Sequence, residues 1–321
     1  NPIQTPIKLK MTTKPMQKNE SFLKFWSPNY WPVWLIYLSI KNLMPLPLLW
    51  QIKIGKYLGR LFRHVSGKSS RTAKKNLEIC FPELSDIARK KLLQHHFEAL
   101  GASLFEMGIG WFAPIKRLRK LIHIEGRQHL DEALKKGSGV ILFTAHFTTL
   151  EVGVSILQDL CKDCSCVYRP QRNAMIDSMI RRGRSRFARE QIPRNDVRAM
   201  LRSLKRNGAV VYLPDQTYLG KQSEMLPFFG QPALTNIATS KLARLSGATV
   251  LPYFFKRLPD DSGYVVNIGA PLPNFPTENA SKDTRRLIAL LEKHIRAAPE
   301  QYLWTYRKFK RRPWGYPDLY E

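Results

Sequence analysis

The chain has 321 residues, of which 44% are hydrophobic and 24% are charged, and this composition argues against an intrinsically disordered protein. Its length fits one large domain, or one domain with an appendage. With 52 Lys and Arg residues against 25 Asp and Glu residues, the formal net charge is +27. A surface this basic attracts polyanions, but the charge alone does not distinguish nucleic acid, anionic lipid, phosphorylated substrates and acidic proteins.

The N-terminal region has the composition of a membrane segment. Residues 1–10 precede Met11, and we expect them to be an extraneous remnant that takes no part in the fold. Residues 11–53 are predicted to form a leader and an N-terminal membrane-anchoring helix. The apolar part, from Tyr30 to Trp50, is close to the roughly 20 residues that a membrane span needs. Four of the seven tryptophans lie between residues 26 and 50, and tryptophan is enriched at membrane interfaces.

This apolar segment is interrupted, so its arrangement stays open. Lys41 and Asn42 divide the apolar run, and Pro45 and Pro47 break helical hydrogen bonding. A spanning anchor, a helix that dips into one leaflet and a buried core helix all fit this pattern. Because basic residues dominate the chain after this segment, the positive-inside tendency predicts that most of the protein faces the cytoplasm.

Residues 54–118 are predicted to be a helical region. From Ile87 onward apolar residues recur at spacings of three and four, as on the buried face of an amphipathic helix, and Ser85 is a suitable N-cap. The adjacent residues His95 and His96 cannot share one helix face. We therefore interpret them as surface or packing residues.

Residues 119–321 show the alternation of an α/β domain, followed by a C-terminal helix and a basic tail. Short β-rich runs alternate with helical runs, and this predicts a largely parallel central sheet flanked by helices. Several predicted helices stop at a glycine, namely Gly137, Gly208 and Gly247. The expected strands are 121–126, 139–145, 166–170, 209–215, 249–255 and 264–269. The expected helices are 127–137, 148–160, 173–188, 195–208 and 234–247.

Two polar residues come directly after predicted strands. His146 comes after "GVILFTA", and Asp215 comes after "AVVYLP". In open α/β sheets, binding sites lie outside the carboxyl ends of the strands. We therefore expect His146 and Asp215 to share one site.

Glu151 lies five residues after His146, and two explanations of this spacing stay open. Residues five apart in a continuous helix are turned by about 140° from each other, so the two side chains meet only if His146 lies on a turn and Glu151 in the first helical turn. The segment "TTLE" fits a capping box with Thr148 as N-cap, in which Glu151 only caps the helix. In the catalytic explanation, the imidazole takes a proton from an attacking alcohol, and the carboxylate fixes its tautomer.

The four cysteines do not form a recognisable metal site. Three of them, Cys161, Cys164 and Cys166, lie in "CKDCSC", while Cys80 is remote in the sequence. A zinc site normally needs four ligands from two paired elements, and the chain has no second paired motif. We expect reduced, unligated thiols and no bound metal.

Six sequence motifs occur in the order found in one enzyme family. Over about residues 22–316 the chain resembles the late acyltransferases of lipid A biosynthesis, the Kdo-lipid A lauroyl and myristoyl transferases, within the wider lysophospholipid acyltransferase group. Glycerol-phosphate acyltransferases usually carry aspartate where Glu151 stands, so this residue favours the lipid A branch. The motifs are HFTTLE, YRPQRNAMID, RRGRSRF, YLPDQ, ARLSGATVLPYF and APEQYLWTYRKFKRRP.

The resemblance implies a reaction and its partners. A fatty acyl group passes from the thioester of acyl carrier protein to a hydroxyl on the 3-hydroxyacyl chains of a lipid A precursor. This happens at the cytoplasmic face of a Gram-negative inner membrane, without metal or soluble cofactor. The acidic carrier, the phosphorylated acceptor and anionic membrane lipid all suit the net charge. The acyl chain also implies an apolar tunnel, which the helical residues 85–112 and the β-rich runs could line.

The resemblance also implies roles for individual residues. His146 is the general base and Glu151 its orienting partner. Arg184 is expected to contact the acceptor phosphate or the thioester oxygen, and Asp215 to hold that arginine or a sugar. Arg169 is a further candidate for substrate binding. The family often has histidine directly after the aspartate, where this chain has glutamine.

Two other functions and one structural question stay open. One is a glycerolipid acyltransferase with a smaller acceptor. Another is a non-catalytic basic protein that binds anionic membrane or nucleic acid, although the chain has no zinc finger, RNP motif or glycine-rich phosphate loop, so we expect no nucleic acid partner. The tail either contacts the membrane surface, or its aromatic residues pack against the protein while its charged residues are solvated. Its aromatic and basic residues are Trp304, Arg307, Lys308, Lys310, Arg311 and Arg312.

Overall fold

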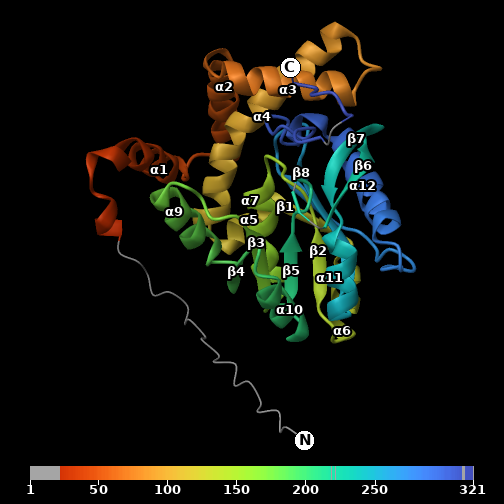
Figure 1. The fold of residues 1–321 in the computed structure, drawn as a ribbon. Helices are drawn as coiled ribbons and strands as arrows, with labels where there is room; N and C mark the ends of the chain where they lie inside the picture. The colour runs from red at the N-terminus through yellow and green to blue at the C-terminus, as the bar shows by residue number, and fades with distance from the viewer. Residues whose placement is uncertain (1–21, 218, 221, 313–314, 321) are drawn as a thin grey trace, which may run out of the picture.

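The computed structural model describes residues 22–217, 219–220, 222–312 and 315–320 (Figure 1). The expectations for residues 1–10, and for the leader before Phe22, lie outside this part of the chain. The described part begins with helices, continues as an α/β domain and ends with a segment that returns to the helices.

The helical region is built around one long helix, α4, whose N-cap is Ser85 as predicted. Its neighbour α2 packs so closely that the two backbones touch. A side chain at Gly59 would lie 2.0 Å from the carbonyl oxygen of Phe97, and one at Gly101 would lie 2.1 Å from the carbonyl oxygen of Gly55. The elements are η1 (Phe22–Phe25), η2 (Pro28–Tyr30), α1 (Trp31–Leu43), α2 (Leu48–Val65), α3 (Gly67–Cys80), α4 (Asp86–Phe112) and α5 (Ile115–Leu121).

The segment predicted to anchor the protein is divided between two helices. α1 ends at Leu43 and α2 begins at Leu48, so the break falls at Pro45 and Pro47, where proline interrupts helical hydrogen bonding. Neither α1, α2 nor any other helix in the described ranges has both the length and the apolar character to cross a bilayer. The boundary expected between residues 53 and 54 lies inside α2.

The predicted α/β architecture is confirmed. Seven strands form one sheet in the order β1-β9-β8-β2-β5-β3-β4, and every neighbouring pair is parallel except β8 with β9. The strands of this sheet are β1 (Ile122–Glu125), β2 (Val140–Phe143), β3 (Cys164–Tyr168), β4 (Glu190–Pro193), β5 (Ala209–Tyr212), β8 (Thr249–Arg257) and β9 (Tyr264–Ile268). The helices are α6 (Arg127–Lys135), α7 (Leu150–Ser155), α8 (Leu157–Leu160), α9 (Ala174–Arg184), α10 (Val197–Lys205), α11 (Ala238–Ser246) and α12 (Ala280–Ala297), with η3 at Pro299–Gln301.

Three details of the α/β domain differ from the sequence analysis. Strand β4 and the antiparallel hairpin of β6 (Ser223–Phe228) and β7 (Gln231–Asn236) were not predicted. Residues 234–236, expected to start a helix, complete β7, so α11 starts only at Ala238. Gly247 ends α11 in the left-handed region as predicted, but after α10 that conformation is taken by Asn207 and not by Gly208.

The carboxyl ends of the central strands face the helical region. In Figure 1, β5 points toward the end of the molecule where α2, α3 and the C-terminus lie. Strands β2 and β5 are buried along their whole length, as expected for the middle of a sheet covered by helices on both faces. The loops after these two strands therefore lie between the sheet and the helical region.

Candidate active site

His146 and Asp215 meet at the carboxyl ends of two adjacent strands. In the β2–β5 ladder, Phe143 pairs with Tyr212. His146 comes three residues after Phe143, and Asp215 comes three residues after Tyr212. Equal offsets from one paired position bring the two side chains together. The hydrogen bonds between them confirm that the two residues lie together, as predicted.

The carboxylate of Asp215 holds both the ring and the backbone of His146. Its Oδ1 lies 2.6 Å from the ring nitrogen Nδ1, and its Oδ2 accepts the backbone N–H of His146 at 3.1 Å. An ionised carboxylate only accepts hydrogen bonds, so Nδ1 carries the proton. In the neutral ring, Nε2 is then the basic nitrogen. The side chain of His146 is 30% exposed and that of Asp215 2%, so a buried acid holds a ring that solutes can reach.

Asp215 is ionised despite its burial. Loss of water opposes its charge, but the charge and the two hydrogen bonds of His146, with the nearby cation of Lys308, hold the pKa of Asp215 below its usual value. A charged Asp215 stabilises the imidazolium that forms when His146 takes a proton. The pair therefore has the geometry and the charge of a general base with its orienting acid.

The predicted contact between Glu151 and His146 is not present among the described residues, because Asp215 occupies Nδ1 of His146. Helix α7 begins at Leu150 after Thr149, one residue later than expected, and no side chain caps it. The backbone N–H of Thr148, the expected cap, instead donates to the carbonyl of Gln301 at 2.8 Å. Both Glu151 and His146 are described, and no hydrogen bond joins them.

Glu151 instead forms a second polar cluster with Arg184 and Trp111, which both donate hydrogen bonds to it. The guanidinium of Arg184 donates from Nε to both oxygens of Glu151, at 3.1 and 3.2 Å, and from Nη2 to Oε1. The indole N–H of Trp111 donates to Oε2 at 2.9 Å. Burial opposes the charge of Arg184, but the carboxylate of Glu151 keeps the pKa of Arg184 above its ordinary value. Arg184 is therefore a fixed cation.

Trp111 was missed in the sequence analysis because it lies 40 residues before Glu151. It is the penultimate residue of α4, and Gly183 of α9 lies against its ring. A side chain at Gly183 would come within 2.4 Å of the indole. The glycine next to Arg184 was the one local signal that something large packs there.

The structure does not bring Arg169 into either polar group. It comes after β3 on the exposed surface. Within the described residues its side chain makes no hydrogen bond or ion pair with His146, Glu151, Arg184 or Asp215. Its predicted role in substrate binding stays a prediction.

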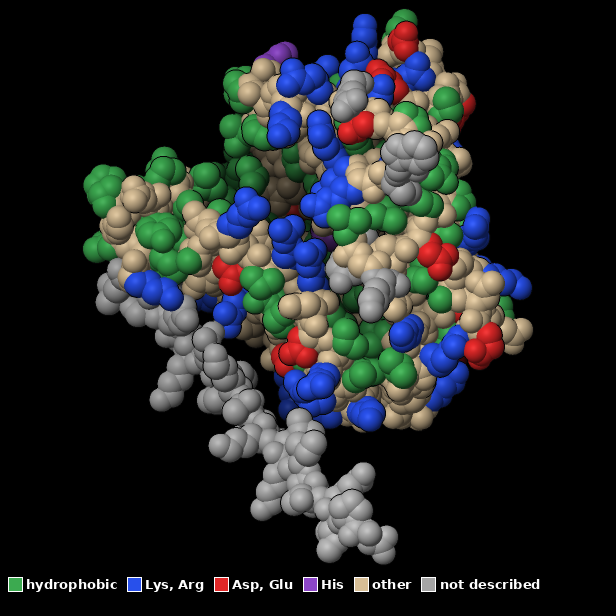
Figure 2. Space-filling model, in the orientation of Figure 1, with side chains coloured by type: hydrophobic (Ala, Val, Ile, Leu, Met, Phe, Trp, Pro, Cys, Tyr) green, Lys and Arg blue, Asp and Glu red, His purple; other side chains and the backbone are tan. Residues whose placement is uncertain are grey.

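Two cavities lined by described residues differ from the expected apolar tunnel. One, of about 20 Å³, lies beside Asp215 and is lined mainly by Phe143, Phe228 and α12. It has room for about one water molecule. The larger, of about 460 Å³, lies at the start of β8, the end of that strand opposite to the site. Figure 2 shows Lys and Arg side chains gathered around a recess between the lobe that contains α1 and the rest of the molecule.

The cysteines are free thiols, and three of them are buried. Burial raises the pKa of Cys166 to about 12, against the opposing charge of Arg184. Across the described ranges no three His, Cys, Asp or Glu side chains are grouped so that they could hold a metal ion.

Comparison with known proteins gives a consistent result. The family model for "Bacterial lipid A biosynthesis acyltransferase" matches residues 18–311. The chain is 36% identical over 305 residues to the lipid A biosynthesis palmitoleoyltransferase of Escherichia coli K12, covering 92% of this chain and 97% of that protein. It is 34% identical over 298 residues to the lipid A biosynthesis lauroyltransferase of the same organism, covering 91% and 96%. With the lipid A biosynthesis myristoyltransferase of that organism the identity is 23% over 303 residues, covering 92% and 94%.

Proposed function

This chain belongs to the bacterial lipid A biosynthesis acyltransferase family, and from that premise we propose how it works. It is an O-acyltransferase of the late lipid A type, and its acceptor is a lipid A precursor. We propose that the donor is the thioester of acyl carrier protein and that the attacking group is a hydroxyl on a 3-hydroxyacyl chain of the acceptor.

His146 is the general base of the proposed reaction. Its Nε2 takes the proton of the acceptor hydroxyl as the oxygen attacks the thioester carbonyl. The tetrahedral intermediate then expels the carrier thiolate, and the imidazolium donates its proton to this thiolate. The ester forms, the thioester breaks, and His146 returns to its starting state. Base catalysis of this kind typically contributes about 10² to 10⁴ in rate.

The second cluster supplies a positive charge to the same reaction. Glu151 occupies Nε and Nη2 of Arg184, and Nη1 has no hydrogen-bond partner among the described residues. We propose that Nη1 receives an oxygen of the substrate, either of the acceptor phosphate or of the thioester. In this proposal Glu151 fixes Arg184, and Trp111 fixes Glu151.

One observation carries this proposal: a buried, ionised carboxylate holds Nδ1 of a partly exposed histidine. The test is an in vitro assay with acyl carrier protein thioester and a Kdo-bearing lipid A precursor, read by product mass. We expect His146→Ala to abolish transfer while the protein stays folded by circular dichroism. Full transfer by this variant would remove His146 from the mechanism. Transfer to glycerol phosphate in place of the lipid A precursor would support a smaller acceptor.

The exposed face of α1 and α2 supports a position on the anionic inner membrane, on its cytoplasmic side. Of the 19 large hydrophobic side chains exposed in the described residues, 12 lie between Trp26 and Val65. From Ser21 to Leu77 the sequence has ten Lys and Arg residues and no acid. An apolar surface on helices that carry cations and no acid of their own suits anionic headgroups over an apolar layer.

Vesicle flotation tests this position. Trp50 and Leu61 are both exposed, and 11 residues apart they lie on one face of α2. We expect Trp50→Glu with Leu61→Glu to reduce binding to phosphatidylglycerol vesicles strongly. The control is Leu245→Glu, an exposed position on α11. Equal binding by both variants would contradict this position.

A further inference from the structure

The C-terminal segment 299–309 crosses the candidate site and pairs with the loop that carries His146. The carbonyl of Gln301 accepts the N–H of Thr148 at 2.8 Å, and the N–H of Leu303 donates to the carbonyl of His146 at 3.1 Å. Between these bonds, Phe147 and Tyr302 form an isolated antiparallel bridge. A segment more than 150 residues away in the sequence therefore fixes the backbone on both sides of the base.

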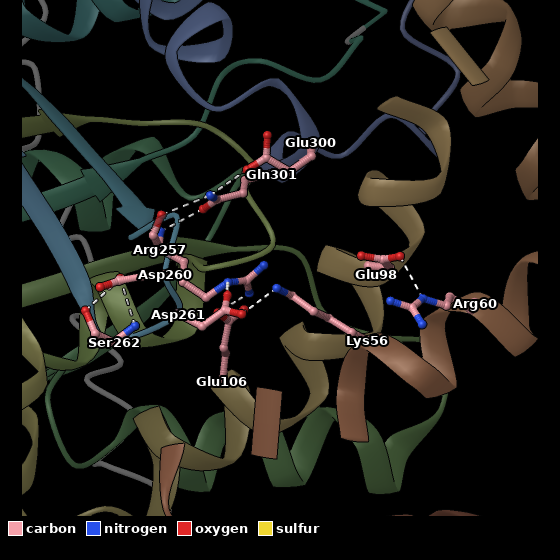
Figure 3. Close-up of polar contacts among 10 residues, drawn as sticks. All are labelled: Lys56, Arg60, Glu98, Glu106, Arg257, Asp260, Asp261, Ser262, Glu300 and Gln301. Atoms are coloured by element: carbon pink, nitrogen blue, oxygen red, sulfur yellow. Dashed lines mark hydrogen bonds and ion pairs between the residues drawn. The ribbon is translucent and has the colours of Figure 1, made fainter. Parts of the chain in front are cut away.

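Gln301 fastens this segment to the sheet. Its side-chain oxygen accepts the N–H of Arg257 at 2.8 Å, and its side-chain nitrogen donates to the carbonyl of Arg257 at 3.2 Å (Figure 3). Arg257 ends β8 and is itself held by Glu106 at 2.6 Å. The segment is thus anchored at a rigid part of the fold before it reaches the site.

Tyr302 contacts the acid that orients the base. Its hydroxyl donates to Oδ2 of Asp215 at 3.2 Å. Burial, and next the charge of Asp215, raise the pKa of the Tyr302 phenol well above its usual value, so the hydroxyl keeps its proton. Oδ2 then accepts two hydrogen bonds, from Tyr302 and from the N–H of His146, while Oδ1 is left for the imidazole.

Lys308 holds Asp215 from the backbone side. Its buried Nζ donates to the carbonyl oxygen of Asp215 at 2.6 Å and lies 5.0 Å from the ring centroid of Phe228. The hydroxyl of Thr217 returns a hydrogen bond to the carbonyl of Lys308 at 2.8 Å. Of the basic and aromatic tail residues, Trp304 and Lys308 are therefore packed inside the protein and are not available to the membrane.

We propose that Tyr302 is a positioning residue of the acyl transfer, which acts on His146 through the carboxylate of Asp215. This inference rests on the proposed function. The hydroxyl fixes the rotation of the carboxylate so that Oδ1 faces Nδ1. It also withdraws negative charge from the carboxylate. A less basic carboxylate holds the imidazolium less tightly, so the imidazolium can return its proton to the leaving thiolate.

The ring and the hydroxyl of Tyr302 can be separated experimentally. The ring packs against Phe147, Phe228 and Trp304, with centroid distances of 5.6, 6.1 and 4.9 Å. Across the described residues the hydroxyl has one hydrogen-bond partner, Asp215. Tyr302→Phe therefore removes the contact to the acid and keeps the packing.

We expect Tyr302→Phe to lower kcat about tenfold, as for loss of a hydrogen bond to a charged group, with KM changed less than about twofold. The acid limb of the kcat/KM profile should move to higher pH, by about half a unit, because the carboxylate then stabilises the protonated base more strongly. Tyr306→Phe is the matched control. Among the described residues its hydroxyl has one hydrogen-bond partner, the carbonyl of Thr217 at 3.4 Å, and both parameters should stay unchanged.

Two further measurements separate a positioning role from a structural one. In an Asp215→Asn background, Tyr302→Phe should cause little additional loss, because the residue acts through that carboxylate. Replacement of Tyr302 by 3-fluorotyrosine, whose phenol is a stronger donor and fills nearly the same space, should move the acid limb to lower pH. This second variant tests the proposal even where Tyr302→Phe does not fold.

An unchanged rate and pH profile in Tyr302→Phe would overturn the proposal, as would a full additional loss in the Asp215→Asn background. His146→Ala distinguishes this failure from failure of the proposed function. If His146→Ala is inactive while Tyr302→Phe behaves as wild type, only the role of Tyr302 is lost. If His146→Ala is active, the proposed function itself is lost.

Discussion

Two buried acids in this protein are each paired with a basic side chain, yet their surroundings differ in the feature that matters for catalysis. Asp215 pairs with His146, whose side chain is 30% exposed, and Glu106 pairs with Arg257, whose side chain is 4% exposed. His146 keeps a free ring nitrogen on an accessible ring. Arg257 is enclosed between Glu106 and Asp261, and Asp261 is bound in turn by Lys56 (Figure 3).

The pKa values of the two acids move in opposite directions, because the balance between burial and neighbouring charge differs at the two sites. Burial opposes the charge of both carboxylates. At Asp215 the interactions with His146 and Lys308 prevail, and its pKa falls below the usual value. At Glu106 burial prevails over the charge of Arg257, and its pKa rises. A buried ion pair is thus a candidate for chemistry when one partner keeps a ring or polar atom that solutes can reach. It has a structural role when both partners are enclosed.

Neutralising Asp215 should reduce the rate of acyl transfer, whereas neutralising Glu106 should reduce stability. We expect Asp215→Asn to lower kcat by about 10³ to 10⁴, because the amide favours the wrong histidine tautomer, while the protein stays folded. The measurement is the rate of acyl transfer together with a thermal melt. A rate within tenfold of wild type would show that Asp215 does not orient the base.

Glu106→Gln should show the opposite pattern. Loss of one partner from a buried ion pair costs about 3 kcal/mol, so we expect a corresponding fall in the free energy of unfolding, measured with urea. The rate per folded molecule should change little, because Glu106 does not contact His146 or Arg184. A large loss of rate at unchanged stability would contradict the distinction between the two acids.

Two largely buried histidines, His96 and His294, should make the stability of the protein depend on pH. Burial lowers the pKa of His96 and of His294 to about 4 in the folded protein. The unfolded chain therefore binds more protons than the folded protein between about pH 6.5 and 4, and stability falls as pH falls through this window. Each histidine should cost about 2 kcal/mol between pH 7.5 and 5.0.

His294→Phe tests this pH effect, because the new ring can keep the stacking on Phe254 but does not titrate. The loss of unfolding free energy between pH 7.5 and 5.0 should be smaller in this variant than in wild type. His64→Gln, at an exposed position, should leave the loss unchanged. Identical losses in wild type and His294→Phe would contradict the assignment.

The cluster of Glu151, a third largely buried acid, gives the smallest expected effect. Gly183→Ala places a methyl group within 2.4 Å of the Trp111 ring and should displace the indole from Glu151. We expect kcat to fall about tenfold, the effect of one lost hydrogen bond to a charged group. Gly67→Ala is the control, since no atom lies within 4 Å of the added methyl group. Unchanged activity in Gly183→Ala would show that Trp111 does not support Arg184.

The sequence predicts those parts of the site that depend on strand ends. His146 and Asp215 each come after an apolar run, and parallel strands bring their carboxyl ends to one edge of the sheet, so their meeting was predictable. The partner of His146 was not predictable from local spacing. Helix α7 starts one residue late, and α9 supplies Arg184 to occupy Glu151.

The remaining parts depend on contacts between distant segments. Trp111 and Tyr302 reach the site from α4 and from the C-terminal segment, and no local pattern marks either residue. The β6–β7 hairpin was missed because residues 234–236, which end β7, were assigned to the helix that begins two residues later. The anchor was predicted as one helix because composition shows apolar content, whereas the prolines at positions 45 and 47 decide where the helices end.

The central claim is that Asp215, and not Glu151, holds the Nδ1 proton of His146. Long-range ¹H–¹⁵N correlation spectra of the histidine side chains, with His146 assigned by its loss in His146→Ala, test this directly. We expect the Nδ1–H tautomer of His146 in wild type and in Glu151→Gln, and its loss in Asp215→Asn. A tautomer that changes in Glu151→Gln and persists in Asp215→Asn would contradict the account.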